Sequence, residues 1–173
     1  MNSFLPENYE VPTSDGNYLK LKDGDTKFRI LSSAVIGWEA WIAKKPIRKR
    51  VDEQFTPDEV DMFDTNDDGS PRKPKHFWAF VVYNYGEKRI QIFEITQKTL
   101  MTAIQGFVND ESWGNPMNYD IKINRTGEKL TTEYSVVPTP PAPLAPAIKQ
   151  LWEEAPKINL DALFTGEDPF AIQ

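Results

Sequence analysis

Two stretches of this chain, residues 27–50 and 72–98, combine positive charge with aromatic rings. The first carries seven cations against one acid, Glu39, together with two tryptophans. The second carries six cations and a run of rings that begins at Phe77 and ends at Tyr85. Cations neutralise phosphates and flat rings stack on unpaired bases, so this combination suits a groove for a single nucleic-acid strand.

We predict that both stretches contribute to one such groove. Two alternatives stay open, because alternation along a strand sends about half of the rings into a core, and the cluster at 44–50 also suits a solvated loop or a nuclear-import-like run. The residues predicted to contact single-stranded nucleic acid are Trp38, Trp41, Lys44, Lys45, Arg48, Lys49, Arg50, Arg72, Lys73, Lys75, Phe77, Trp78, Tyr83, Tyr85 and Arg89.

The net charge of -6 hides an uneven distribution along the chain. Residues 27–50 sum to +6 and residues 70–98 to +4, whereas residues 51–69 sum to -8 and residues 150–173 to -4. Because salt screens charges beyond about 8 Å at physiological ionic strength, local patches rather than the net charge decide what the surface attracts. The acidic balance is therefore compatible with a polyanionic ligand.

No group of residues has catalytic spacing, and we expect neither an enzyme nor a cofactor. The chain has no Cys and a single His, His76, which excludes disulfides and thiolate metal sites. Residues 64–69 (DTNDDG) match the first half of a calcium loop, but Pro71 and Lys75 fill the eighth and twelfth positions, the latter in place of the ligating Glu. We predict an acidic turn without a metal. A metal nuclease is the enzyme alternative, but its ligands would have to converge around the metals, which acids crowded into one stretch do not do.

Apolar alternation predicts strands at residues 27–30, 34–42, 77–85, 89–95, 119–124 and 131–137. The strongest signal is the pair 77–85 and 89–95, which flanks a turn at Gly86 and predicts a hairpin. Residues 97–109 follow Thr96 as a cap and place apolar residues at helical spacing, so we expect a helix there. Thr56 followed by Pro57 predicts a short helix inside an acidic insertion at 51–74.

Strands followed by one helix and further strands predict a mainly β fold, a five-stranded OB-fold barrel with one helix. The predicted domain spans residues 27–137, with an N-terminal arm at 1–26. Residues 138–173 are expected to be an extended Pro-rich linker and an acidic C-terminal tail. We also expect an intracellular, soluble protein with no membrane partner, because no apolar run approaches the ~20 residues of a membrane span and the N-terminus lacks a signal peptide.

Four blocks carry a resemblance to a known family: residues 21–32 (LKDGDTKFRILS), 77–85 (FWAFVVYNY), 91–97 (QIFEITQ) and 119–127 (YDIKINRTG). They resemble bacteriophage single-stranded DNA-binding proteins with an OB-fold core, and the likeness covers roughly residues 20–137. It implies a non-catalytic protein in the cytoplasm of the infected bacterial host that coats and protects single-stranded DNA, without sequence specificity, during phage DNA replication, recombination and repair. The favoured binding rings are Trp38, Trp78, Tyr83 and Tyr85. Some relatives hold a structural zinc through Cys and His, which this chain does not share.

Residues 166–170 (GEDPF) are similar to the acidic, Phe-ending tail through which single-stranded DNA-binding proteins dock replication or repair proteins. The chain departs from the pattern in that residues 171–173 follow the Phe. The predicted docking residues are Phe164, Glu167, Asp168, Pro169 and Phe170.

The acidic tail is also expected to fold back on the basic groove and compete with DNA, so that deletion of residues 138–173 tightens binding. The alternative from another class is a protein-interaction or inhibitor module whose basic groove receives an acidic peptide or a host factor.

Overall fold

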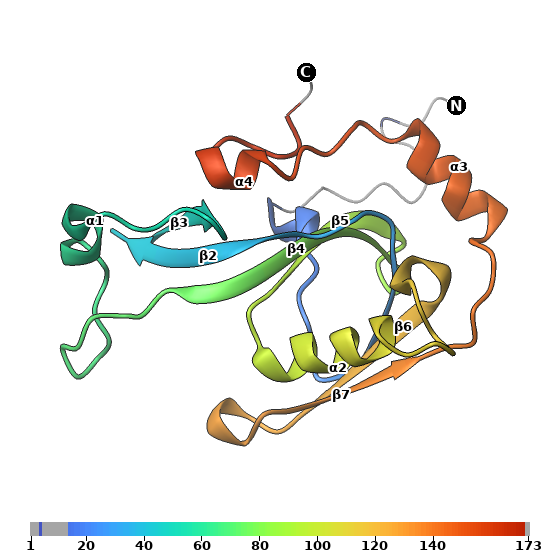
Figure 1. Ribbon diagram of the computed structural model, residues 1–173. Helices are drawn as coiled ribbons and strands as arrows, with labels where there is room; N and C mark the ends of the chain where they lie inside the picture. The colour runs from blue at the N-terminus through green and yellow to red at the C-terminus, as the bar shows by residue number, and fades with distance from the viewer. Residues whose placement is uncertain (1–3, 5–13, 172–173) are drawn as a thin grey trace.

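The computed structural model describes residue 4 and residues 14–171. Within them the fold is mainly β, with seven antiparallel strands in one open sheet and a few short helices (Figure 1). The strands are β1 (Gly24–Ile30), β2 (Val35–Ile42), β3 (Lys45–Arg50), β4 (Lys75–Asn84), β5 (Arg89–Ile95), β6 (Asp120–Thr126) and β7 (Glu133–Pro138). The helices are α1 (Pro57–Asp61), α2 (Lys98–Val108), α3 (Pro146–Glu154) and α4 (Ala162–Thr165), and short 3₁₀ turns lie at η1 (Ser14–Asn17), η2 (Pro116–Asn118) and η3 (Lys129–Thr131).

β1 and β2 together line one edge of β4 as a single bent strand. In β1, Ile30 lies opposite Val82, and β2 continues along the same edge with Val35 opposite Ala79. The register therefore shifts by two residues between the strands, in the short stretch where β1 bends into β2. β5 pairs with the other edge of β4, β6 and β7 follow β1, and β3 follows β2.

The structure differs from the predicted five-stranded barrel in strand number and in closure. The run 45–50 is KPIRKR, in which four of six residues are cations and no apolar alternation marks a strand, yet it pairs with β2 along its whole length. At the other end of the sheet, β7 pairs with β6 and not with β5 in the described residues, which leaves the sheet open. The predicted hairpin of β4 and β5 and the predicted helix α2 are confirmed, but the predicted cap is wrong, because Gln97 and not Thr96 is the N-cap residue and no side chain caps the helix.

A first core lies between the sheet and α2, which covers one face (Figure 1). The apolar stripe of α2, formed by Leu100, Met101 and Ile104, packs against the side of β4 that carries Phe80 and Val82. α2 thus packs through the apolar stripe that its residue spacing predicts, and the opposite side of β4 faces a second layer.

The second layer is residues 144–170, here called the C-terminal segment, and it corrects the prediction of an extended tail. Figure 1 shows α3 and α4 on the side of the sheet opposite α2. They cover the sheet face that carries Phe77, Ala79, Val81 and Ile92, here called the covered face. Local periodicity did not reveal this docking, because the segment's apolar residues are spread over two short helices and an extended stretch: Leu144, Ile148, Trp152, Ile158, Leu160, Leu163, Phe164 and Phe170.

The Pro-rich linker is anchored to the sheet by a buried arginine. The guanidinium of Arg29 donates to the carbonyls of Met117 (3.0 Å) and Ala142 (2.8 Å). It also forms an ion pair with Asp120 (3.4 Å). Because these bonds satisfy a cation that is only 5% exposed, they fix the point from which the C-terminal segment turns back over the sheet.

The insertion at 51–74 is folded in part. α1 begins at the predicted cap, where the Thr56 side chain accepts from the Glu59 N–H and the Glu59 side chain accepts from the Thr56 N–H. After α1, Ile42 bridges to Phe63 and Thr65 to Pro71, so the insertion returns beside the end of β2. Of the predicted arm, residues 1–3 and 5–13 lie outside the described residues, whereas residues 14–26 contain η1, the bridge from Tyr18 to Ile92 and the start of β1. The division of the chain at 26 and 137 stays a prediction. No helix in the described part is long and apolar enough to cross a membrane.

Candidate nucleic-acid interface

The two basic clusters meet around Trp41, at the end of β2. One hollow of about 510 Å³ is lined by Trp41, Lys44 and Arg72 among others. A second, of about 630 Å³, shares Trp41 and Arg72 and adds Lys73 and Lys75. We call these two hollows together the Trp41 groove. Trp41 is half-buried and the four cations are exposed, so a ring stands among mobile positive charges, the arrangement that a single strand requires.

The insertion forms one wall of the Trp41 groove. Besides the cations, the two hollows are lined by Asp64, Thr65, Asn66 and Ser70. The half calcium loop of the sequence thus contributes Asp64, Thr65 and Asn66 to this wall, and Asp67 lines neither hollow. In the described residues, no three His, Cys, Asp or Glu side chains gather as metal ligands would.

Arg48 lies on the covered face, over the ring of Phe77, and is neutralised there. Its Nε donates to Glu39 (3.0 Å) and its Nη2 to Glu94 (2.7 Å), and its side chain is 13% exposed. Burial and the hydrogen bond with Glu94 raise the pKa of Glu39 to about 8, against the opposing effect of Arg48. Two carboxylates therefore share one guanidinium and, below that pH, one proton.

Arg50 is engaged by the C-terminal segment. Its guanidinium bonds to Asp161 (3.2 Å) and lies over the ring of Phe164, 4.4 Å from the centroid. Phe164 also packs on Phe77, with 5.8 Å between ring centroids. Gly37 makes room for this ring, because a Cβ on it would stand 2.9 Å from Phe164. An acid and a ring of the protein itself thus occupy two of the predicted DNA contacts.

The remaining predicted rings lie in three environments. Phe77 and Tyr83 are buried under the C-terminal segment. Tyr85 is half-buried and donates from its hydroxyl to Asp120 (2.8 Å); burial, with this hydrogen bond, raises the pKa of Tyr85. Trp78 packs against the first core, on the α2 side. Trp38 is 39% exposed on that same side of the sheet, where it contacts His76.

Three further predicted contacts take separate positions. Lys45 is exposed at the start of β3. Lys49 pairs with Glu59 of α1 (3.3 Å) and lies near the ring of Phe55. Arg89 is half-buried and donates to Asn17 (3.4 Å). The structure thus gathers Trp41, Lys44 and the cluster 72–75 in one open groove, and it places the other predicted residues under cover, in the core or elsewhere on the surface.

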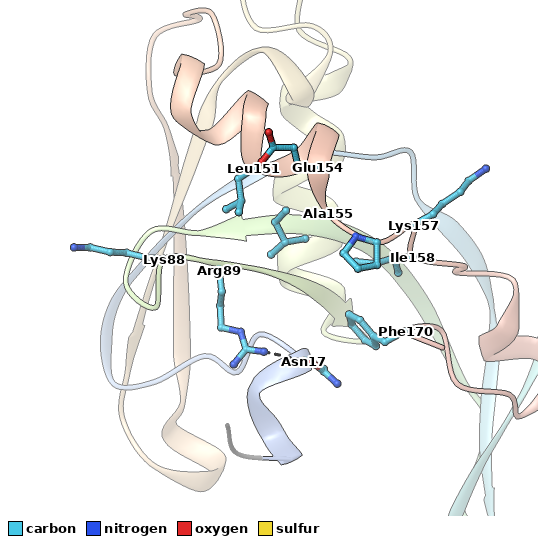
Figure 2. A pocket seen from close by; sticks show the side chains of 11 residues that line it. Asn17, Lys88, Arg89, Leu151, Glu154, Ala155, Lys157, Ile158 and Phe170 are labelled. Carbon is cyan, nitrogen blue, oxygen red and sulfur yellow. Dashed lines mark hydrogen bonds between the residues drawn. The ribbon is translucent and has the colours of Figure 1, made fainter. Parts of the chain in front are cut away.

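A cavity of about 520 Å³ lies beneath the C-terminal segment, between α3 and β5 (Figure 2). Ile90, Leu151, Ala155, Ile158 and Phe170 line it, and Figure 2 shows the side chains of Lys88 and Lys157 pointing away from it. The segment therefore bridges this part of the sheet and leaves an open hollow beside β5.

The predicted docking residues divide into packed and exposed ones. Phe164 and Phe170 are half-buried and Pro169 is buried, whereas Glu167 and Asp168 are exposed. Phe170 contacts the ring of Tyr18 at 6.0 Å, and the N–H of Asn159 donates to the carbonyl of Pro169 (2.9 Å). Pro169 and Phe170 are thus held against the rest of the described fold.

The chain is similar to a protein of Escherichia phage T5 that is named "Probable ssDNA-binding protein". The two are 25% identical over 138 residues, which covers 69% of this chain and 53% of the relative. The chain therefore spans about half the length of the curated relative it matches. No protein-family model and no solved structure matches the chain.

Sequence reasoning missed the wall of the Trp41 groove and the roles of Arg29 and Asp64. Arg29 lies in a strand where charged residues alternate with uncharged ones, so the pattern gave no indication that its side chain is buried. Asp64 stood in a motif that suggested metal binding, while its partners lie about twenty residues earlier in the chain. Both act through long-range contacts, which spacing along the chain does not encode.

Proposed function

We propose that this protein binds single-stranded DNA without sequence specificity and has no catalytic activity. The observation that carries the proposal is the Trp41 groove, in which exposed cations from two distant clusters surround one ring. The name of the phage T5 relative supports the same ligand. By the family resemblance, the protein would coat and protect single strands during phage DNA replication, recombination and repair, in the cytoplasm of the infected host.

An OB-type core is part of this proposal. The order of the strands in the sheet supports it: β5 lies beside β4, β4 beside the bent strand formed by β1 and β2, and β1 beside β6, which pairs with β7. Along the chain, α2 lies between β5 and β6. OB folds are partly open and bind oligonucleotides on the face of their second and third strands. When β1 and β2 are counted as one bent strand and β3 is left aside, β4 and β5 are the second and third strands of the chain. The covered face is their outer side, away from α2.

In the proposed complex, Lys44, Arg72 and Lys75 contact phosphates and Trp41 stacks on a base. Each stacked base contributes roughly 1 to 3 kcal/mol, and the phosphate contacts make the affinity fall steeply with salt. Contacts with Arg50, Phe77 and Tyr83 need the C-terminal segment to leave the covered face, whereas Arg48 would have to exchange Glu39 and Glu94 of the sheet for a phosphate. The segment thus competes with the strand, as its acid and ring on Arg50 support.

Release of the segment would also free Phe164, Glu167, Asp168, Pro169 and Phe170. We propose that these residues then dock replication or repair proteins. Binding of single-stranded DNA to the covered face and binding of a partner protein to the released segment would favour each other, because both require the undocked state.

Titration with oligo-dT, followed by tryptophan fluorescence at several salt concentrations, tests the proposal. The parent protein should be quenched, with a steep salt dependence. Trp41→Ala should weaken binding about tenfold, and Trp38→Ala, which removes a ring on the α2 side of the sheet, should weaken it less. Absence of binding at low salt would overturn the proposed function.

A second candidate is a module that receives an acidic peptide, and the docked C-terminal segment favours it, since an acid and apolar side chains already fill the covered face. The same titration separates the two functions, because a peptide-binding module shows no response to oligo-dT.

A further inference from the structure

The turn that carries Lys44 into the Trp41 groove has an unfavourable backbone. Ala43 and Lys44 join β2 to β3 as a two-residue loop with φ of 52° and 63°. Both values lie in the left-handed region, which costs a residue other than glycine roughly 1 to 2 kcal/mol. Tight hairpins of this kind usually use Asn-Gly or Gly-Gly, so something outside the turn must stabilise it.

Asp64 supplies that stabilisation. Its carboxylate accepts from the N–H of Ala43 at 2.9 Å and from the N–H of Lys44 at 2.8 Å, one oxygen for each. These charge-assisted bonds saturate both amides of the loop. They come from the insertion, about twenty residues along the chain.

The backbone of Asp64 joins the other two parts of the groove. Its N–H donates to the carbonyl of Trp41 (2.7 Å), and its carbonyl accepts from the N–H of Arg72 (2.9 Å). Asp64 is therefore hydrogen-bonded to the backbone of Trp41, to the turn that carries Lys44, and to the backbone of Arg72. Lys44 and Arg72 are exposed, and among the wall residues that the structure describes Asp64 alone is hydrogen-bonded to Trp41, Lys44 and Arg72.

We propose that Asp64 is the positioning residue of the nucleic-acid groove, which holds Lys44 and Arg72 beside Trp41. This inference rests on the proposed function. It makes a prediction opposite in sign to simple electrostatics, because removal of an acid beside a phosphate groove ordinarily strengthens binding. Here the loss of Asp64 releases Lys44 and should weaken binding.

The experiment compares Asp64→Ala with Asp67→Ala in the full chain. Asp67 is an exposed acid of the same insertion, so the two variants change the net charge equally. Oligo-dT affinity and its salt slope are measured with thermal unfolding alongside. We expect Asp64→Ala to bind three- to tenfold more weakly, with a salt slope lower by about 0.7, as for one lost phosphate contact on a single strand. Asp67→Ala should bind as tightly as the parent or slightly more so.

A double-mutant cycle with Lys44→Ala identifies the route. If Asp64 acts through Lys44, its removal has little further effect in the Lys44→Ala background. If Asp64→Ala unfolds the insertion, Asp64→Asn, which keeps one acceptor, gives the same comparison in a milder form. Tighter binding by both Asp64 variants, or equal losses with and without Lys44, overturns the inference while the proposed function stands. A parent that does not bind oligo-dT overturns both.

Discussion

At the scale of single residues, the cluster of Glu39, Arg48 and Glu94 makes stability depend on pH. Glu39 is buried and its pKa is raised from 4.5 to about 8. The folded protein thus holds a proton that the unfolded chain releases above pH 4.5. The stabilisation is present below that pH and is lost as pH rises toward 8, because the native state binds more protons than the unfolded state in this window.

Glu39→Gln should remove this pH dependence. An amide keeps an acceptor for Arg48 and offers a donor to Glu94 without a charge to bury. The parent should lose about 1 to 3 kcal/mol more unfolding free energy than the variant between pH 5 and pH 8, after allowance for solvent screening. Urea unfolding of both proteins at the two pH values measures it. Parallel losses in parent and variant would show that Glu39 is ionised throughout.

Residue identity predicted chemistry better than it predicted position. The ring and cations of the Trp41 groove were predicted as contacts from composition alone, and the groove brings them together. Phe77 and Trp78 are adjacent aromatic residues in the same basic stretch, yet Trp78 packs toward α2 and Phe77 packs under the C-terminal segment. Alternation assigns such neighbours to opposite faces without telling which face a distant segment covers.

At the scale of elements, the strands with apolar alternation and the amphipathic helix α2 could be predicted, because their packing partners act on a regular stripe. β3 could not, since it consists mostly of cations, and the acids that pair with them come from other parts of the chain: Glu39, Glu94, Glu59 and Asp161. The docking of α3 and α4 could not either. Their apolar residues are irregularly spaced, and they match the covered face only in three dimensions.

The docking of α3 leaves space that a larger side chain can fill. Ala155 follows α3 and lines the cavity over β5 (Figure 2). Ala155→Leu adds apolar surface there, which should raise the free energy of unfolding by about 0.5 to 1.5 kcal/mol. If single-stranded DNA binds to the covered face, the same variant should bind oligo-dT more weakly, because the C-terminal segment then undocks less readily. A gain in stability with unchanged affinity would show that the strand does not displace α3.

At the scale of the whole molecule, strand binding and segment docking are coupled equilibria. When the binding-competent form is a minor fraction, the apparent Kd rises in proportion to the docking constant. Deletion of residues 138–173 is a blunt test of this coupling, because it would also expose Leu31, Phe77, Val81 and Ile92, which the C-terminal segment buries. Single substitutions that weaken docking keep most of that cover.

Leu163→Ala is the appropriate change, since Leu163 is 5% exposed and belongs to the cluster over Phe77. Truncation of a buried Leu costs about 2 to 5 kcal/mol, and this cost falls on the docked state alone. Affinity for oligo-dT should therefore increase, by tenfold or more if the docked form dominates in the parent. Leu130→Ala, at a fully exposed position in η3, is the matched control and should leave affinity unchanged. Because Ala155→Leu and Leu163→Ala shift the same docking equilibrium in opposite directions, competition requires opposite changes in affinity. Changes of the same sign, or no changes, would show that single-stranded DNA binds only in the Trp41 groove and that the C-terminal segment stays docked on the covered face.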